Sequence, residues 1–272
     1  MDHRLTPATR RIAHTSLMGK HDAPAFTDGI PLRLTNPLTD LLRYPNGARE
    51  RQLWLGETFT VIDQNDGHAF GFAAKDGYCG WLPETALADT PATTHWVAAP
   101  ASHLYPDPRV QTRELAALPM GARLHVLDQD AKWTKTNLGY LPTPHLRGLD
   151  DWLTDPTTVA ESLLGTPYLW GGNSRAGIDC SGLVQLAFHA CGLPCRGDSD
   201  LQETLGHPLP DDAPPERGDL IFWRGHVAIV TDPETLLHAN GHSMSVAFEP
   251  IKACITRIQQ QDGGPVSHRR RP

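Results

Sequence analysis

Cys180 directly follows an acidic residue and directly precedes a run of regularly spaced apolar residues. In "CSGLVQLAFHACG" the apolar residues recur at steps of three and four until Gly192, which predicts a helix that begins near Cys180. Asp179 is placed to cap that helix. The N–H groups and positive end of a helix lower the pKa of a thiol in its first turn, and a thiolate is the nucleophile that acyl transfer needs. A lone cysteine is more often an inert core residue, so this chemistry requires partners.

Two histidines downstream are candidate partners. The stretch "RGDLIFWRGHVAIVTDPETLLHANG" predicts a strand over 220–223, a turn, a second strand opened by His226, and a further β run ending at His238. A histidine at the mouth of each of two consecutive strands places two imidazoles side by side on a sheet edge. One can act as general base and the other can orient it. Cys180, His226 and His238 are therefore the candidate catalytic set.

Metal or cofactor chemistry has little support in the sequence. His238 and His242 have the spacing of a helical zinc pair, but Asn-Gly between them favours a turn. Cys191 and Cys195 are separated by three residues and have no second pair at ligand spacing, which argues against zinc and redox sites. We expect no metal and no cofactor.

Composition narrows the classes of partner. The chain has 272 residues and a formal net charge of -7, which gives no general electrostatic support for binding nucleic acid or an anionic membrane. Neither a signal-peptide core nor a membrane span is evident, and the five cysteines are an odd set that fits reduced thiols. We expect a cytoplasmic protein without a membrane partner; the oligomeric state is left open.

The first half of the chain contains an internal repeat. Two stretches each begin with Tyr-Pro and end with Asp-Gln: "YPNGARERQLWLGETFTVIDQ" from Tyr44 and "YPDPRVQTRELAALPMGARLHVLDQ" from Tyr105. Each is followed by a similar closing segment, "YCGWLPETAL" in the first and "NLGYLPTPHL" in the second. The repeat predicts two small β-barrels, at 32–90 and 91–149, after an N-terminal arm over 1–31. The pattern of Gly, aromatic, aliphatic and Pro resembles bacterial SH3 domains. Most of the aromatic residues are core or rim residues, whereas Tyr78 could face outward.

A different pattern begins near residue 150. "PTTVAESLLG" predicts a helix over 156–165, and "TPYLWGG", "DCSGLVQ", "RGDLIFW", "GHVAIV" and "LLHANG" follow in this order. These motifs resemble the NlpC/P60 family of papain-like cysteine peptidases over about residues 156 to 255. The predicted fold class is α+β, with two SH3-like β-barrels followed by a papain-like NlpC/P60 domain over 150–272.

The resemblance implies an activity and assigns roles. The three-domain arrangement resembles γ-D-glutamyl-L-diamino acid endopeptidases, which cut cell-wall stem peptides. Cys180 matches the nucleophile, His226 the base and His238 the third polar residue. Tyr168 matches a tyrosine near the nucleophile that holds substrate or oxyanion. The implied partner is a murein peptide, L-Ala-γ-D-Glu-diamino acid, with lysine or diaminopimelate at the third position.

The resemblance to enzymes with this three-domain arrangement also implies recognition of a free N-terminal L-Ala, through an Asp-Ser pair after the nucleophile helix and a tyrosine of the first SH3 domain. Asp198 and Ser199 match the pair, and Tyr78 matches the tyrosine. A carboxylate suits an ammonium group. Such sequences usually read Arg-Asp-Ser, whereas here Gly197 separates Arg196 from Asp198. The resemblance therefore assigns no role to Arg196.

Asp179 and Ser181, which flank the nucleophile, have two readings each. They are either substrate contacts or local helix-start residues, Asp179 as cap and Ser181 in the first turn.

Three functions are compatible with these residues. The leading one is a peptidase that acts on murein fragments, as in cell-wall peptide recycling. The second is a non-catalytic wall-peptide-binding protein, against which the intact candidate set argues. The third is acyl transfer or cleavage of another amide, such as the muramyl-L-alanine bond, because nucleophile and base are common to all these reactions.

Overall fold

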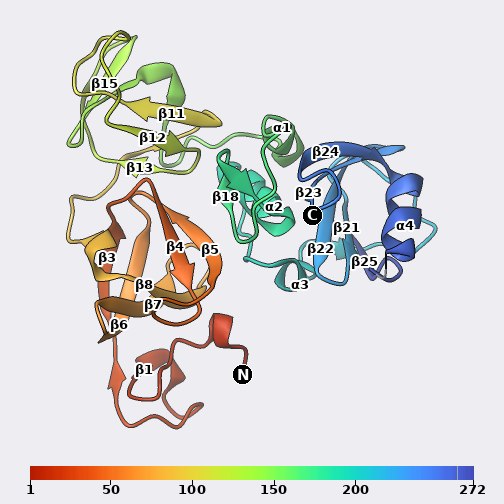
Figure 1. The fold of residues 1–272 in the computed structure, drawn as a ribbon, viewed down its shortest axis with the longest axis horizontal. Helices are drawn as coiled ribbons and strands as arrows, with labels where there is room; N and C mark the ends of the chain where they lie inside the picture. The colour runs from red at the N-terminus through yellow and green to blue at the C-terminus, as the bar shows by residue number, and fades with distance from the viewer. Residues whose placement is uncertain (262) are drawn as a thin grey trace. The chain divides into compact units, whose positions relative to one another are not determined.

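β-strands outnumber helices in the computed structural model, which describes residues 1–261 and 263–272 (Figure 1). The chain divides into two compact units, Met1–Asp151 and Trp152–Pro272. Among the described residues, no helix has the length and apolar character needed to span a bilayer.

The first unit contains a seven-stranded antiparallel sheet in the order β5-β4-β8-β7-β6-β3-β9. Alternate side chains point inward and form an apolar core that includes Leu41, Phe59 and Leu82. Gly71 is required by close packing, since a Cβ there would lie 1.9 Å from the Thr60 carbonyl oxygen. The strands are β3 (Ile30–Leu34), β4 (Leu38–Leu42), β5 (Arg49–Trp54), β6 (Thr58–Asn65), β7 (His68–Ala73), β8 (Cys79–Pro83) and β9 (Leu87–Ala88).

The rest of the first unit is a second β module with its own core, formed by residues such as Val97, Leu118 and Leu141. Its strands form three small sheets, β13-β10-β17, β11-β12 and β14-β15-β16. They are β10 (His95–Val97), β11 (Ala101–Leu104), β12 (Ala116–Pro119), β13 (Arg123–Leu124), β14 (Val126–Gln129), β15 (Trp133–Thr136), β16 (Tyr140–Pro142) and β17 (Leu146–Gly148).

The repeat seen in the sequence has a structural counterpart. In the first module β8 leads through a 3-10 helix, η3 (Glu84–Ala86), into β9. In the second, β16 leads through η4 (Thr143–His145) into β17. The shared Leu-Pro sequence ends the strand in both cases, because proline fixes its own φ and offers no N–H to a ladder.

The N-terminal arm contacts the seven-stranded sheet of the first module. It contains η1 (His3–Leu5), β1 (Ala13–His14), η2 (Thr15–Leu17) and β2 (Phe26–Thr27). Thr9 and Arg11 both donate to the Asp63 carboxylate of β6, at 2.7 and 2.8 Å.

The second unit is built on a six-stranded antiparallel sheet in the order β20-β25-β21-β22-β23-β24. The strands are β20 (His207–Pro208), β21 (Leu220–Trp223), β22 (His226–Asp232), β23 (Thr235–Asn240), β24 (Ser245–Pro250) and β25 (His268–Arg271). The remaining elements are α1 (Pro156–Glu161), a small hairpin of β18 (Asn173–Ser174) and β19 (Gly177–Ile178), α2 (Cys180–Ala190), α3 (Ser199–Gln202) and α4 (Ile251–Gln260).

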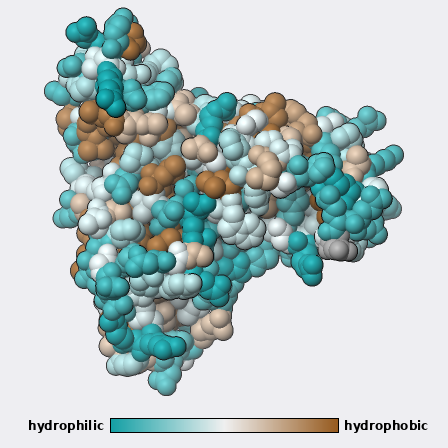
Figure 2. Space-filling model, in the orientation of Figure 1, coloured by the Kyte–Doolittle hydropathy of each residue, from teal (hydrophilic) through white to brown (hydrophobic). Residues whose placement is uncertain are grey.

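Helices α2 and α4 lie on opposite sides of this sheet (Figure 1). Helix α2 packs against β22 and β23. Helix α4 packs through Ile251, Cys254 and Ile258 onto apolar residues of β21 to β23. Its outer face is hydrophilic, as Figure 2 shows at the right. Because β22 is covered on both faces, its interior residues are all buried, which explains its continuous apolar sequence "VAIV".

Candidate active site

Cys180 is the first residue of α2, and Asp179 is the N-cap. The Asp179 carboxylate accepts from the backbone N–H of Gly182 at 2.6 Å and from the Ser181 hydroxyl at 3.0 Å. Its other oxygen accepts from the backbone N–H of Gly171 at 2.9 Å. The cap thus fixes both the start of the helix and the glycine turn before it. The thiol sits at the positive end of α2 and is 8% exposed.

These contacts bear on the two readings of Asp179 and Ser181. Both residues are buried, and they bind each other and the local backbone. The geometry therefore favours a role in building the helix start over direct substrate contact. The glycine turn is equally tight, since a Cβ on Gly182 would lie 2.5 Å from the Gly172 carbonyl oxygen.

His226 and His238 are brought together by the pairing of β22 with β23. His226 Nε2 lies 2.8 Å from His238 Nδ1, and the ring centroids are 5.0 Å apart. His226 opens β22, as the sequence predicts. One expectation was wrong: β23 does not end at His238. It continues to Asn240 because the ladder with β24 extends to the Asn240–Ser245 pair.

Burial controls the protonation of both histidines. Burial, together with the neighbouring His238, lowers the pKa of His226 from 6.5 to about 3. Burial also lowers the pKa of His238 to about 4, opposed by the carboxylate of Glu249. Both rings are neutral at neutral pH, so His226 can accept a proton. Its Nε2 is engaged with His238, which leaves Nδ1 as the basic nitrogen.

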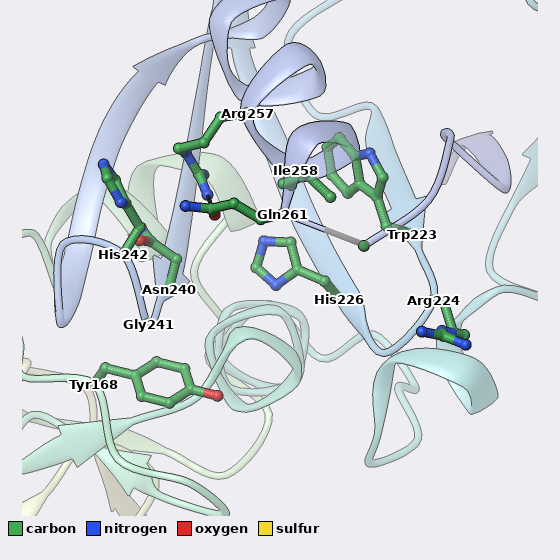
Figure 3. Close-up of a pocket in the computed structure, with 11 residues that line it drawn as sticks. Tyr168, Trp223, Arg224, His226, Asn240, Gly241, His242, Arg257, Ile258 and Gln261 are labelled. Carbon is green, nitrogen blue, oxygen red and sulfur yellow. Dashed lines mark hydrogen bonds between the residues drawn. The ribbon is translucent and has the colours of Figure 1, made fainter.

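Tyr168 and His226 line one cavity of about 450 Å³ (Figure 3). The Tyr168 backbone is held between two elements, with its N–H donating to the Met244 carbonyl at 2.9 Å and a bridge to Ile178 before α2. Burial raises the pKa of Tyr168, and the adjacent Cys180 and Asp179 raise it further. The hydroxyl therefore remains a hydrogen-bond donor close to the thiol.

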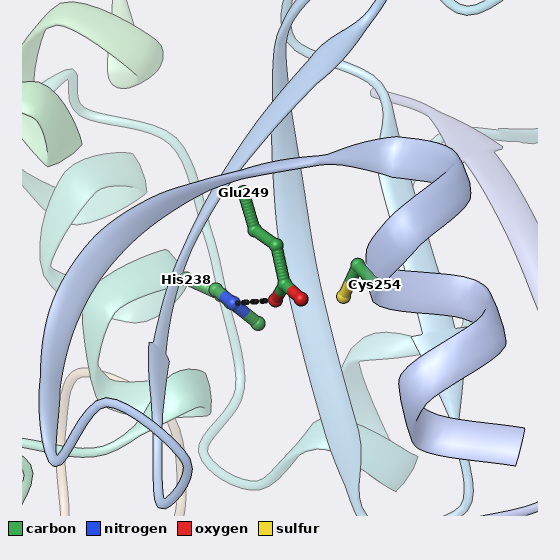
Figure 4. A group of neighbouring side chains, drawn as sticks. All are labelled: His238, Glu249 and Cys254. Atoms are coloured by element: carbon green, nitrogen blue, oxygen red, sulfur yellow. Dashed lines mark hydrogen bonds and ion pairs between the residues drawn. The ribbon is translucent and has the colours of Figure 1, made fainter. Parts of the chain in front are cut away.

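Behind His238 lies a cluster that the sequence did not indicate (Figure 4). Glu249 Oε2 lies 3.1 Å from His238 Nε2, and Arg257 of α4 donates to both carboxylate oxygens, at 2.9 and 2.7 Å. Glu249 follows His238 by eleven residues and precedes Arg257 by eight. Only the register of β24 and the docking of α4 bring them together, so no local spacing could have identified them.

His238, Glu249 and Cys254 offer ligand atoms within 4.8 Å of one another, but they do not suit a metal ion. The Arg257 guanidinium already neutralises Glu249, and its Nη2 lies 3.7 Å from Cys254 Sγ. A divalent cation would therefore meet a fixed positive charge. Burial also raises the pKa of the Cys254 thiol to about 12, so it stays protonated.

The loop that carries Asp198 and Ser199 is tied to the nucleophile helix. Gln202, which is fully buried, donates to the backbone carbonyls of Ser181 and Arg196, at 2.9 Å in each case. Asp198 has φ 65° and ψ 140°, a conformation unusual for a residue with a side chain. Such strain is concentrated at functional sites. Sequence reasoning missed Gln202, which resembles an ordinary helix residue.

Tyr78 does not face outward as expected. It is 2% exposed and belongs to the apolar core of the first barrel. The Arg51 guanidinium lies 5.9 Å from its ring centroid. The ring is large and mostly apolar, so packing inside the barrel is favoured over exposure. Its assignment to substrate binding stays a prediction.

Comparison with known proteins identifies two domains. The model of the NlpC/P60 family matches residues 165–260, and that of the bacterial dipeptidyl-peptidase SH3 domain matches residues 41–87. A Bacillus cereus protein named gamma-D-glutamyl-L-lysine dipeptidyl-peptidase is 27% identical over 275 residues, covering 85% of this chain and 80% of that protein. Dipeptidyl-peptidase 6 of Lysinibacillus sphaericus is 28% identical over 194 residues, covering 61% of this chain and 69% of its own.

A solved structure has the same fold. The crystal structure of an NlpC/P60 family protein from Bacillus cereus superposes with a TM-score of 0.74, at 21% sequence identity, and covers 89% of this chain and 99% of that one.

Proposed function

Residues 165–260 form an NlpC/P60 domain and residues 41–87 a bacterial SH3 domain, and from this we propose that the chain is a cysteine endopeptidase. Its substrate is the γ-D-glutamyl to L-diamino acid amide bond of murein peptides. The observation that carries the proposal is the placement of Cys180 at the positive end of α2, in a helix packed on the strands that bear the hydrogen-bonded pair His226 and His238.

The mechanism follows from these positions. His226 Nδ1 takes the thiol proton, and the Cys180 sulfur attacks the γ-carbonyl carbon of D-Glu. The oxyanion that forms is stabilised at the helix start and by the Tyr168 hydroxyl. The imidazolium then gives its proton to the leaving amine of the diamino acid, which leaves a thioester on Cys180. Water, deprotonated by His226, attacks the thioester and releases the acyl group.

The substrate's N-terminus supplies specificity. Asp198 would bind the ammonium group of a free N-terminal L-Ala, with Ser199 as a further polar contact. The tie from Gln202 to the nucleophile helix supports this assignment, because it fixes the loop relative to Cys180. The Bacillus cereus relative is named for L-lysine at the third position, and both lysine and diaminopimelate fit the proposal.

The second β module and the arrangement of the catalytic unit extend the proposal. We assign residues 91–149 as a second SH3-like domain, supported by the repeated order of strand, 3-10 helix and strand. We assign the catalytic unit a papain-like arrangement, supported by a nucleophile at the start of a helix that packs on the antiparallel sheet bearing the base.

A role in recycling murein fragments in the cytoplasm is the cellular part of the proposal. The five cysteines, all in the described part of the chain, form no disulfide, which supports a reducing compartment. Cell fractionation with detection of the native protein tests it, and recovery outside the cytoplasm would contradict the recycling role.

The chemistry is tested with two peptides and two variants. L-Ala-γ-D-Glu-diaminopimelate and its lysine counterpart are each supplied free and N-acylated by muramic acid, and products are followed by mass spectrometry. We expect L-Ala-D-Glu from the free peptides alone. Cys180→Ala should abolish the release of L-Ala-D-Glu, whereas Cys191→Ala, at the other end of the same helix, should leave it unchanged.

Other outcomes select the alternatives. Cleavage of acylated peptides would retain the peptidase and remove the N-terminal pocket. Binding without cleavage by folded protein would indicate the wall-peptide-binding protein. Release of the intact L-Ala-γ-D-Glu-diamino acid peptide from its muramyl form would indicate the amidase.

A further inference from the structure

The Glu249 carboxylate is surrounded by hydrogen-bond donors. Arg257 donates Nε–H to Oε1 and Nη2–H to Oε2, and the Cys254 thiol also donates to this carboxylate. Hydrogen bonds from Arg257 lower the pKa of Glu249 to about 2, so it is ionised at every pH of interest. An ionised carboxylate only accepts hydrogen bonds. The nitrogen of His238 that lies 3.1 Å away, Nε2, must therefore carry a proton.

The protonation of His238 determines that of His226. A neutral imidazole carries one proton, so His238 Nδ1 is an acceptor. His226 Nε2, 2.8 Å from it, is then the donor of the hydrogen bond between the rings. His226 Nδ1 is left with a free electron pair. The direction of every hydrogen bond, from Arg257 to His226, is thus fixed by one carboxylate.

We propose that Glu249, held by Arg257, is a positioning residue that sets the tautomers of His238 and His226 and supports the imidazolium formed when Cys180 is deprotonated. The proposal rests on the proposed function, in which His226 Nδ1 is the base. In this proposal Glu249 contacts neither the substrate nor the Cys180 thiol, and acts on His226 mainly through His238.

The charge of Glu249 matters as well as its geometry. Its carboxylate raises the pKa of both His226 and His238 against the larger effect of burial, whereas Arg257 lowers both. The charged or titratable described groups that line the cavity with His226 or lie close to the two rings are Tyr168, Arg224, His242, Glu249, Cys254 and Arg257. Cys180 and Asp179 act in turn on Tyr168. Glu249 contacts His238 directly, at 3.1 Å. Without it, the thiolate–imidazolium pair loses a stabilising negative charge.

Alkylation of Cys180 tests this without any substrate. The full-length protein is treated with iodoacetamide over a range of pH, and modified Cys180 is quantified by peptide mapping. Glu249→Ala should move the midpoint of the rate profile upward by about one pH unit, with about tenfold slower alkylation below the midpoint. Glu249→Gln keeps an oxygen acceptor but loses the charge, and should give a smaller upward shift.

A double-variant experiment separates positioning from general destabilisation. In a His238→Gln background, Glu249→Ala should shift the midpoint much less, because the hydrogen-bonded route to His226 is gone and only the charge of Glu249 still acts on that ring. Glu234→Ala, which removes an exposed carboxylate from the turn between β22 and β23, is the matched control and should leave the profile unchanged.

The outcomes are decisive in either direction. An unshifted midpoint in folded Glu249→Ala, or in folded Glu249→Gln if the alanine variant does not fold, overturns the proposal. So does an undiminished shift in the His238→Gln background. Since alkylation needs no peptide, a protein that shows the shifts but cleaves no murein peptide would retain this proposal and refute the peptidase.

Discussion

At the residue scale, the chemistry depends on a few side chains whose environments differ from those on the surface. His238 is 1% exposed, and its two ring nitrogens are occupied by His226 and Glu249. The buried His238 ring and the half-buried His226 ring, both neutral and in contact, form the proposed base with a fixed orientation. Burial keeps the Tyr168 hydroxyl protonated, and we propose it as a donor in the site.

Removing that hydroxyl should weaken the chemical step. Tyr168→Phe keeps the ring and its packing but removes the donor, so kcat should fall about a hundredfold with little change in KM. Steady-state hydrolysis of L-Ala-γ-D-Glu-diaminopimelate measures both constants. Tyr44→Phe, at a tyrosine 57% exposed in the first unit, serves as control. An increase in KM alone would assign Tyr168 to substrate binding.

At the element scale, the start of α2 is the feature on which the site depends. Asp179→Ala removes acceptors for Gly182, Ser181 and Gly171 together, and should lower the free energy of unfolding of the second unit by about 1 to 2 kcal/mol. It should also lower kcat/KM, since the helix start would no longer hold Cys180. Urea unfolding and steady-state kinetics provide the two measurements.

Asp155→Ala is the matched control for this prediction. Asp155 caps α1 in the same unit, accepting from the backbone N–H of Thr157 at 2.8 Å. Its loss should cost comparable stability without a comparable loss of kcat/KM. Equal losses of activity in both variants would mean that the cap contributes only stability.

The sequence predicts features that depend on neighbouring residues, and it does not predict contacts between residues far apart in the chain. The helix start at Cys180 and the strand opened by His226 follow from periodicity and turn residues. The extension of β23 beyond His238, the burial of Tyr78, and the contacts of Glu249, Arg257 and Gln202 depend on strand register and on packing between distant segments. Those contacts exist only in the folded chain, so no pattern of neighbouring residues encodes them.

At the scale of the whole molecule, the two units have separate cores, and the pH dependence of the catalytic unit follows from its own buried histidines. Their folded pKa values, about 3 for His226 and about 4 for His238, lie below the unfolded value of 6.5. The unfolded chain therefore binds more protons as the pH falls below 6.5. The contribution of the two histidines to the free energy of unfolding is therefore fully present above pH 6.5. It is lost progressively as the pH falls from 6.5 through their folded pKa values of about 4 and about 3.

Hydrogen exchange of β22 and β23 between pH 4 and pH 8, corrected for intrinsic exchange rates, should reveal this loss as falling protection toward acid. In His238→Gln one of the two groups is absent, so the pH dependence should be shallower. A variant with the same slope as the wild-type protein would mean that other groups govern acid sensitivity.

The strand order of the catalytic sheet has a consequence for biosynthesis. β25 (His268–Arg271) follows every other strand of the sheet in the chain, yet it lies between β20 and β21 rather than at an edge. While a ribosome is still adding these residues, β20 has no partner and β21 has only β22. The nascent enzyme should thus complete its sheet only after Arg271 has emerged, which delays the appearance of a reactive thiol until synthesis has passed the whole catalytic unit.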